Sequence, residues 1–221
     1  MTRAAVIFDL DGVLLDSEAL QYKAYSEVLG RFGITVSIED YAAHWIAAGR
    51  GPEYAVRTYG LQMHPDELRG LKHPVYHDIL RREAVLMPGA VSVLSRLQPH
   101  FPLALATNSN RQDVSFVVDH FDLRGFFSAL VAREDYEHAK PYPDAFVTAA
   151  ARLGVTPADC VVVEDAYRGV LAAHRAGAVV VAVPNRFTRG GDFSLAALVL
   201  PSLDPLNADV VTRLVAHHHA A

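Results

Sequence analysis

The chain has 221 residues, of which 51% are hydrophobic, and it carries a formal net charge of −5 at neutral pH. This length and apolar content exclude a disordered chain and suit one domain, or one domain with a smaller inserted module. The acidic balance provides no basic face, so we expect no nucleic-acid partner.

The first predicted element is an apolar strand, residues 4–8, which ends in two acids. Asp9 and Asp11 follow it directly, and Gly12 allows a sharp turn just beyond them. Residues two apart in a strand point to the same side, so we expect both carboxylates to converge on one small volume. Two like charges held that close raise a pKa or need a cation between them. The end of this strand is therefore a candidate site.

Residues 16–87 have the pattern of an all-helical insert. A helix is predicted over residues 18–32, with apolar residues on one face and Asp16 or Ser17 as its cap. Glycines punctuate the rest of this stretch, and it contains no convincing buried strand. We therefore expect a small helical cap domain at residues 16–87.

After residue 88, short apolar strands alternate with helices. This alternation predicts a doubly wound α/β core with a mostly parallel sheet, built from residues 1–15 and 88–221. The predicted strands are 102–106, 129–132, 160–163 and 178–183, and the predicted helices are 90–98, 112–121, 144–153 and 167–176.

Three of the predicted strands end in polar clusters. Ligands of open α/β sheets bind beyond the carboxyl ends of the strands, so these clusters should meet at one edge of the sheet. The clusters are Asp9 with Asp11, Thr107 with Asn108, and Glu164 with Asp165.

The acids in these clusters suit magnesium and phosphate chemistry. Asp9, Asp11 and Asp165 supply the hard anionic oxygens that Mg²⁺ prefers together with a substrate phosphate. A carboxylate beside such a metal can also attack phosphorus and form an aspartyl-phosphate.

The polar residues suit the binding of a phosphoryl group. Thr107 and Asn108 could hold its oxygens at the start of the following helix, where the helix dipole favours anions. The transition state spreads negative charge over these oxygens, so a lysine should lie nearby. Lys140, in a loop between core elements, is the candidate.

Four segments of the chain resemble, in order and spacing, the four motifs of the haloacid dehalogenase-like hydrolases. They are FDLDGVLLDSE at residues 8–18, TNS at 107–109, KP at 140–141 and VEDAYRGV at 163–170. The helical insert resembles the small cap of the phosphoglycolate phosphatase and β-phosphoglucomutase branch. The resemblance covers essentially the whole chain and implies a hydrolase of phosphoric monoesters.

The resemblance implies the catalytic roles. Asp9 would be the nucleophile that becomes phosphorylated. Asp11 would act as general acid and then as general base for water, while its main-chain carbonyl binds Mg²⁺. Lys140 would offset the phosphoryl charge and steady Asp9. The presence of Asp11 argues against dehalogenation, because dehalogenases of this superfamily lack that second acid.

The resemblance also implies the binding residues. Thr107 and Asn108 would bind the transferring phosphoryl group. Asp9, Asp11 and Asp165 would hold Mg²⁺, with Glu164 as a further ligand or as a partner through water.

The substrate depends on residues of the cap. Arg50, in the segment Ala48–Gly51, could bind a second anionic group of the substrate, because guanidinium pairs well with phosphate or carboxylate. β-Phosphoglucomutases typically carry a histidine where this chain has Gln21, which favours a phosphatase over a phosphomutase. We expect a small phosphomonoester, such as a sugar phosphate or phosphoglycolate, as substrate. A phosphomutase and a non-catalytic binding protein are the alternatives.

Other features of the sequence predict the partners, the cellular compartment and the oligomeric state of the protein. No apolar stretch approaches the length of a membrane-spanning helix, and acids interrupt the apolar N-terminal stretch, so we expect no membrane partner and no secretory signal. The single cysteine, Cys160, cannot form an internal disulfide, which favours the cytoplasm. A monomer suffices for the expected site.

Overall fold

The computed structural model describes residues 4–220, which divide into two compact units. Residues 16–85 form the helical unit, and the residues on either side of it form the core unit. The second boundary lies two residues before the expected one, so Leu86 and Met87 belong to the core. Leu86 forms a β-bridge with Leu15, and the Met87 N–H donates to the Leu14 carbonyl at 2.9 Å.

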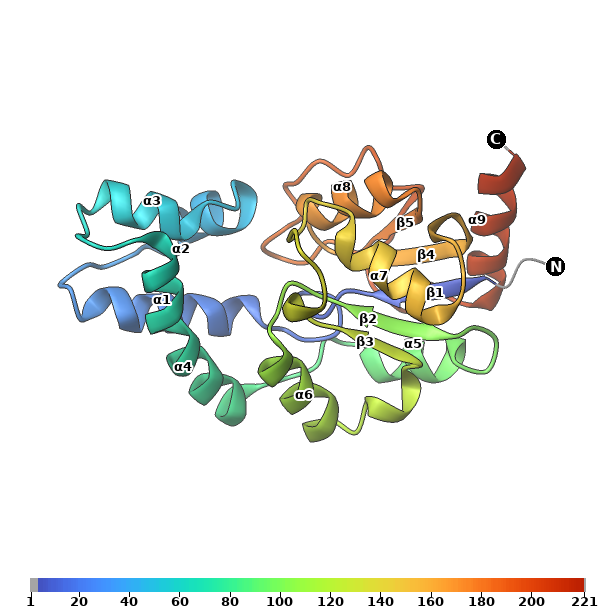
Figure 1. The fold of residues 1–221 in the computed structure, drawn as a ribbon, viewed down its shortest axis with the longest axis horizontal. Helices are drawn as coiled ribbons and strands as arrows, with labels where there is room; N and C mark the ends of the chain where they lie inside the picture. The colour runs from blue at the N-terminus through green and yellow to red at the C-terminus, as the bar shows by residue number, and fades with distance from the viewer. Residues whose placement is uncertain (1–3, 221) are drawn as a thin grey trace. The chain divides into compact units, whose positions relative to one another are not determined.

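A parallel sheet forms the centre of the core unit (Figure 1). Within residues 4–220 it has six strands in the order β3-β2-β1-β4-β5-β6, and every neighbouring pair is parallel. The predicted doubly wound α/β sheet is therefore confirmed. The strands are β1 (Ala5–Phe8), β2 (Leu103–Ala106), β3 (Ala129–Val131), β4 (Cys160–Glu164), β5 (Val179–Ala182) and β6 (Leu198–Val199).

Helices cover the sheet and bury its side chains. Helices α7 (Asp144–Leu153) and α8 (Tyr167–Ala176) pack on the face to which Ile7 and Val162 belong. Val6, next to Ile7, points to the other face because neighbouring strand residues alternate, and it is also fully buried. The remaining core helices are α5 (Ala90–Leu97), α6 (Arg111–His120) and α9 (Ala208–Ala220), with short 3₁₀ turns at Arg124–Phe126, Arg133–Asp135 and Pro157–Asp159.

Two elements at the end of the core have no counterpart in the sequence-based prediction. Strand β6 has only two residues, which is too short to show an alternating pattern, and it extends the sheet by pairing with β5. Helix α9 packs against β4 and β5. Strand β6 owes its conformation to pairing with β5, whereas α9 has a local start signal in Asn207, whose Oδ1 accepts a hydrogen bond from the Val210 backbone N–H.

The helical unit contains no strand within residues 16–85. Its first helix ends two residues earlier than predicted, and Phe32 is exposed, because the chain turns at Gly33 with a positive φ of 73°. The elements are α1 (Glu18–Gly30), α2 (Ile38–Tyr41), a π-helical turn (Ala42–Ala47), α3 (Gly51–Thr58) and α4 (Pro65–Glu83), and α1 packs along α4.

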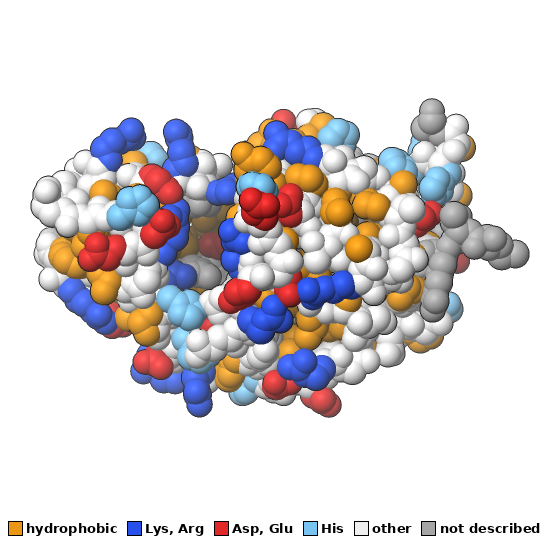
Figure 2. All heavy atoms as spheres, viewed as in Figure 1, with side chains coloured by type: hydrophobic (Ala, Val, Ile, Leu, Met, Phe, Trp, Pro, Cys, Tyr) orange, Lys and Arg blue, Asp and Glu red, His pale blue; other side chains and the backbone are white. Residues whose placement is uncertain are grey.

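The surface of the core unit carries charges of both signs. On the face drawn in Figure 2, lysine and arginine side chains are interspersed with aspartate and glutamate. No helix in the part of the chain that the structure describes is both long and apolar enough to cross a membrane.

Candidate active site

Three buried carboxylates meet where β1 and β4 end. The two strands are neighbours, with Phe8 paired to Val163, so the acids that follow them emerge side by side. One oxygen from each of Asp9, Glu164 and Asp165 lies within 4.8 Å of the others. The parallel sheet therefore brings together acids that are far apart in the sequence.

The Lys140 ammonium lies among these acids. Its Nζ donates hydrogen bonds to Asp9 Oδ1 at 2.6 Å, to Glu164 Oε1 at 2.7 Å and to the Ala106 carbonyl at 3.0 Å. These three acceptors use all the donors of the ammonium group. Lys140 is therefore a buried cation bound to two carboxylates, in the position where the sequence predicts a lysine.

Burial and charge shift the pKa values of this pair. Burial raises the pKa of the Asp9 carboxyl to about 8, against the attraction of the Lys140 ammonium, while Glu164 and Asp11 add like charge. Burial alone would lower the pKa of Lys140, but Asp9 and Glu164 raise it above its usual range. The ammonium therefore stays charged, and the Asp9 carboxyl is easier to protonate than that of an exposed aspartate.

The charge balance of the cluster suits a divalent cation. One ammonium faces the carboxylates of Asp9 and Glu164, with Asp165 in the same cluster. Like-charged buried carboxylates need a cation or a proton. Mg²⁺ prefers a few carboxylate oxygens at a site open to substrate phosphate and water. The residues present therefore fit Mg²⁺.

Asp11 lies beside the loop that follows β2. Its Oδ2 accepts hydrogen bonds from Ser109 Oγ at 2.5 Å and from Thr107 Oγ1 at 3.3 Å. Its Oδ1 is buried and accepts no hydrogen bond from any residue between 4 and 220. Asp11 and Thr107 thus meet as expected, and Asp11 keeps one oxygen without a protein partner.

Asn108 joins the β2 loop to the lysine loop. Its Oδ1 accepts a hydrogen bond from the Lys140 backbone N–H at 3.1 Å and lies 2.8 Å from the Tyr136 hydroxyl, which is also 2.8 Å from the Thr107 carbonyl. The Asn108 oxygen is therefore occupied by two donors of the protein, and its amide nitrogen is the group suited to an anionic ligand.

Arginines of α8 hold the lysine loop from the other side. Arg168 Nη2 donates to the Lys140 carbonyl at 2.6 Å, and Arg175 Nη1 donates to the Pro141 carbonyl at 2.9 Å. The peptide bond between Lys140 and Pro141 is cis. Backbone and side chain of Lys140 are thus both fixed by other elements.

Two glycines let the acids pack closely. A Cβ atom at Gly169 would lie 1.8 Å from Glu164 Oε1, so only glycine leaves room for that carboxylate over the first turn of α8. A Cβ atom at Gly12 would lie 2.3 Å from Asp165 Oδ2, and Gly12 has a positive φ of 76°. Both glycines belong to the motifs that carry the family resemblance.

Three polar residues of this site were not predicted from the sequence. Ser109 lies inside the TNS motif, and its hydroxyl binds Asp11. Tyr136 precedes Lys140 by four residues, and no sequence pattern points to it. Asn185 follows β5, where its amide binds Asp165 at 2.8 Å. Asn185 lies just beyond the strand predicted at 178–183, where open α/β sheets place their ligand-binding residues.

Arg50 belongs to the helical unit. It is exposed at the start of α3, and its backbone N–H donates to the His44 carbonyl at 2.9 Å. It is the one predicted site residue that lies outside the core unit.

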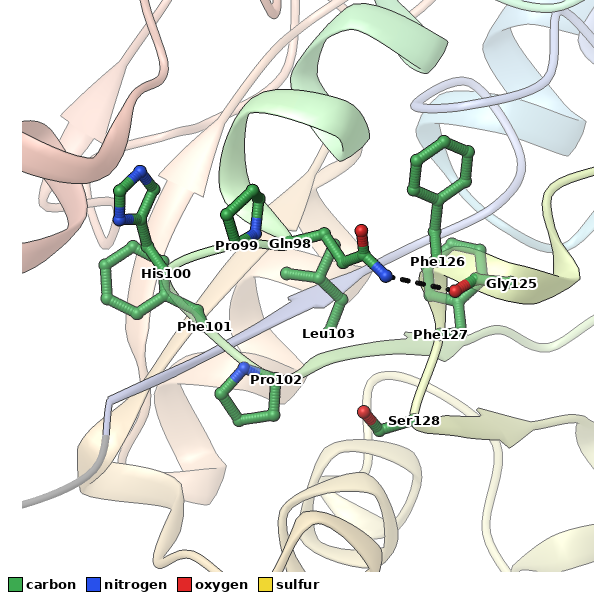
Figure 3. A pocket seen from close by; sticks show the side chains of 10 residues that line it. All are labelled: Gln98, Pro99, His100, Phe101, Pro102, Leu103, Gly125, Phe126, Phe127 and Ser128. Atoms are coloured by element: carbon green, nitrogen blue, oxygen red, sulfur yellow. Dashed lines mark hydrogen bonds between the residues drawn. The ribbon is translucent and has the colours of Figure 1, made fainter.

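A separate surface pocket lies at the opposite edge of the sheet (Figure 3). Residues 98–103 and 125–128 line it, where β2 and β3 begin, and its volume is about 280 Å³. Gln98 Nε2 donates to the Gly125 carbonyl at 3.1 Å within the lining. The pocket contains none of the clustered carboxylates, so it is not part of the candidate active site.

Comparison with known proteins identifies the family. The haloacid dehalogenase-like hydrolase family matches residues 4–177. Fructose-1-phosphate phosphatase YqaB of Escherichia coli is 34% identical over 79% of this chain and 93% of that protein. A probable pseudouridine-5'-phosphatase of Drosophila melanogaster is 35% identical over 89% of this chain and 88% of that protein.

A solved structure agrees with these sequence matches. CbbY from Rhodobacter sphaeroides, in complex with phosphate, has a TM-score of 0.77 and 25% identity over 91% of this chain and 95% of its own. The motif resemblance is thereby confirmed, and the chain belongs to the haloacid dehalogenase-like hydrolases.

Proposed function

We propose that this chain is a magnesium-dependent phosphatase that hydrolyses a small phosphomonoester through a phospho-Asp9 intermediate. The observation that carries the proposal is the buried Asp9 carboxylate, which Lys140 holds by one oxygen at 2.6 Å, with Asp11 two residues further on. A fixed carboxylate beside a second acid supplies a nucleophile and a proton carrier.

The first step transfers the phosphoryl group to the enzyme. Lys140 binds Asp9 Oδ1, which leaves Oδ2 to attack phosphorus in line with the ester oxygen. The Asp9–phosphorus bond forms, the phosphorus–ester bond breaks, and protonated Asp11 gives its proton to the departing alcohol. Asp11 Oδ1 suits this transfer, because it has no hydrogen-bond partner within residues 4–220.

The second step releases phosphate. Asp11 takes a proton from water as the water oxygen attacks phosphorus, and the bond to Asp9 breaks. Lys140 then again faces a free carboxylate at Asp9. Thr107 and the amide nitrogen of Asn108 hold the phosphoryl oxygens in both steps, supported by the N–H groups of their loop.

Asp9, Asp165 and the main-chain carbonyl of Asp11 would hold Mg²⁺, with Glu164 as a ligand or as a partner through water. When bound, Mg²⁺ would supply positive charge to offset the negative charge of the phosphoryl oxygens. The cluster of three buried carboxylates supports this assignment.

The substrate that we propose is a phosphate ester of a sugar or a similar polyol. Two relatives above 30% identity act, by their names, on fructose 1-phosphate and pseudouridine 5'-phosphate, both phosphate esters of a sugar carbon. Arg50 is the proposed contact for a second anionic or polar group of the substrate. An Arg50→Ala variant should then raise KM for the best substrate while leaving kcat for a small aryl phosphate unchanged.

The decisive experiment compares wild type with Asp9→Asn. Wild type should release phosphate from p-nitrophenyl phosphate and from a panel of sugar phosphates when Mg²⁺ is present, and lose this activity with EDTA. Asp9→Asn should be inactive with every substrate. Full magnesium-dependent activity of Asp9→Asn would refute the phospho-Asp9 mechanism.

Two other functions predict different products. A phosphomutase would convert glucose 1-phosphate to glucose 6-phosphate without net release of phosphate, so product analysis of the same assay separates it from a phosphatase. A non-catalytic binding protein would hydrolyse nothing on the panel. The presence of Asp9, Asp11, Lys140 and Asp165 in one core unit supports the phosphatase over the binding protein. We propose that it acts in the cytoplasm as a monomer.

A further inference from the structure

Asn185 lies at the carboxyl end of β5, where it contacts the acid cluster without belonging to it. Its side-chain Nδ2 donates to Asp165 Oδ2 at 2.8 Å and makes a longer contact, 3.4 Å, to the Gly12 carbonyl. Gly12 follows Asp11 directly in the chain, so one amide group touches both the β4 acid and the loop after β1.

The orientation of the Asn185 amide is unambiguous. Its Oδ1 accepts a hydrogen bond from the Phe187 backbone N–H at 2.8 Å. A flipped amide would place its oxygen against the Asp165 carboxylate and the Gly12 carbonyl, and its nitrogen against an N–H. The nitrogen must therefore face Asp165.

The loop around Asn185 holds it in place. Its backbone N–H donates to Thr188 Oγ1 at 3.0 Å, and its carbonyl accepts from Arg189 N at 3.0 Å and from Thr188 N at 3.2 Å. Thr188 is buried. The side chain is therefore presented to Asp165 by a turn that is closed by its own hydrogen bonds.

Gly12, Asp165 and Asn185 are closely packed. A Cβ atom at Gly12 would lie 2.3 Å from Asp165 Oδ2 and 2.7 Å from Asn185 Nδ2. Gly12, Asp165 Oδ2 and Asn185 Nδ2 are thus mutual neighbours, with 2.8 Å between the carboxylate oxygen and the amide nitrogen. A carboxylate that binds metal is commonly oriented by such a hydrogen bond from a neighbouring group.

We infer that Asn185 is a positioning residue that orients the Asp165 carboxylate and so sets the affinity of the site for Mg²⁺. This inference rests on the proposed magnesium site. Removing such an outer partner typically weakens metal binding about 10–100-fold. The amide carries no charge, so its effect comes from the direction of one hydrogen bond.

The test uses two substitutions that separate the contact from the turn. In Asn185→Ser the hydroxyl can still accept the Phe187 N–H, but it is too short to reach Asp165. Asn185→Ala loses both interactions. Mg²⁺ binding to metal-free protein is measured by isothermal titration calorimetry, and unfolding by urea is measured without metal.

Both variants should bind Mg²⁺ about 10–100-fold more weakly than wild type. At saturating Mg²⁺ their kcat should approach that of wild type, because the catalytic groups are intact. The matched control is Asn207→Ala, which removes the side-chain acceptor of Val210 N, 3.0 Å away at the start of α9. This control should lower the resistance to urea and leave the affinity for Mg²⁺ unchanged.

Each of the other possible outcomes would overturn either the inference or the proposed function. Wild-type Mg²⁺ affinity in Asn185→Ser would overturn the inference, because the turn alone would then account for any loss in Asn185→Ala. Wild-type affinity in both variants would overturn it as well. If the wild-type protein itself bound no Mg²⁺ and hydrolysed no phosphomonoester, the proposed function would fail first.

Discussion

Lys140 Nζ lies 2.6 Å from Asp9 Oδ1, although 131 residues separate them in the sequence. The same nitrogen binds Glu164, so one buried cation links the acids of β1 and β4. The backbone of Lys140 is held in turn by Asn108 and Arg168.

Gly169→Ala should disable the site by displacing Glu164. The added Cβ atom would lie 1.8 Å from Glu164 Oε1, and the buried carboxylate would have to leave Lys140. Overpacking of this kind typically costs about 1–3 kcal/mol of stability. We expect a loss of phosphatase activity of at least about tenfold, the equivalent of about 1.4 kcal/mol in the barrier.

Gly70→Ala is the matched control for that substitution. Gly70 lies inside α4, and apart from its chain neighbours and the helix backbone no described atom lies within 4 Å of an added Cβ. Alanine favours a helix interior over glycine by about 1 kcal/mol, so this variant should be as stable as wild type or more stable. Full activity of Gly169→Ala would contradict the packing argument.

Binding of Mg²⁺ should become tighter as the pH rises. Burial raises the pKa of Asp9 to about 8 in the metal-free protein, so below that pH a proton occupies the carboxyl and competes with the cation.

The folded state also holds this proton more tightly than the unfolded chain does. The stability of the metal-free protein should therefore fall as the pH rises from about 4 to about 8.

Calorimetry in two buffers of different ionisation enthalpy measures the protons released per Mg²⁺ bound. We expect release at pH 7 and little release above pH 9. The Asp9→Asn variant serves as control and should show no release from this group. An affinity that stays constant between pH 6 and pH 8 would show that Asp9 is already ionised in the metal-free protein.

Asp135 should contribute stability that is lost in acid. Burial alone would raise its pKa, but hydrogen bonds from Arg152, from the Ala132 backbone and from Arg111 lower it to about 2. The contribution is complete above the unfolded pKa of about 4 and vanishes as the pH falls toward 2. Both arginines are partly exposed, so we expect Asp135→Asn to cost only about 1–2 kcal/mol at pH 7.

Urea unfolding of Asp135→Asn and wild type at pH 7, 5 and 3 measures this cost. The difference between them should shrink at pH 3. Asp209→Asn, at an exposed position of α9, should change stability by less than about 0.5 kcal/mol at each pH. If Asp135→Asn loses as much stability at pH 3 as at pH 7, the loss comes from packing and not from charge.

Tyr136→Phe should slow catalysis without removing any group proposed to touch the substrate. The lost hydroxyl lies 2.8 Å from both the Thr107 carbonyl and Asn108 Oδ1, so Asn108 should hold the lysine loop less firmly. One such hydrogen bond contributes about 1 kcal/mol, which corresponds to a fall in kcat of about fivefold. Steady-state kinetics with an aryl phosphate measures the change.

Tyr142→Phe is the control for that measurement. It removes the same atom from a tyrosine that is 55% exposed and two residues from Lys140. Its kcat should match that of wild type. Equal kcat values for Tyr136→Phe and wild type would show that the hydroxyl does not help to position Asn108.

The order of elements and the edge that carries the site follow from local sequence patterns. Short apolar strands that alternate with helices require a parallel sheet, and the acids at 9, 11, 164 and 165 stand where strands end. A strand has period two and a fixed direction, so the positions of these acids follow from the chain alone. The order of the strands in the sheet and the existence of the short strand β6 depend on pairing between distant segments.

Tertiary contacts decided what each side chain of the site does. The sequence identified Lys140 as a candidate, but only folding shows that its ammonium binds both Asp9 and Glu164. Asn185 and Tyr136 acquire their roles in the same way, because a hydrogen bond depends on distance and direction across the fold. Residue types and spacing therefore determined the family and the place of the chemistry, while packing decided which groups hold the catalytic acids in position.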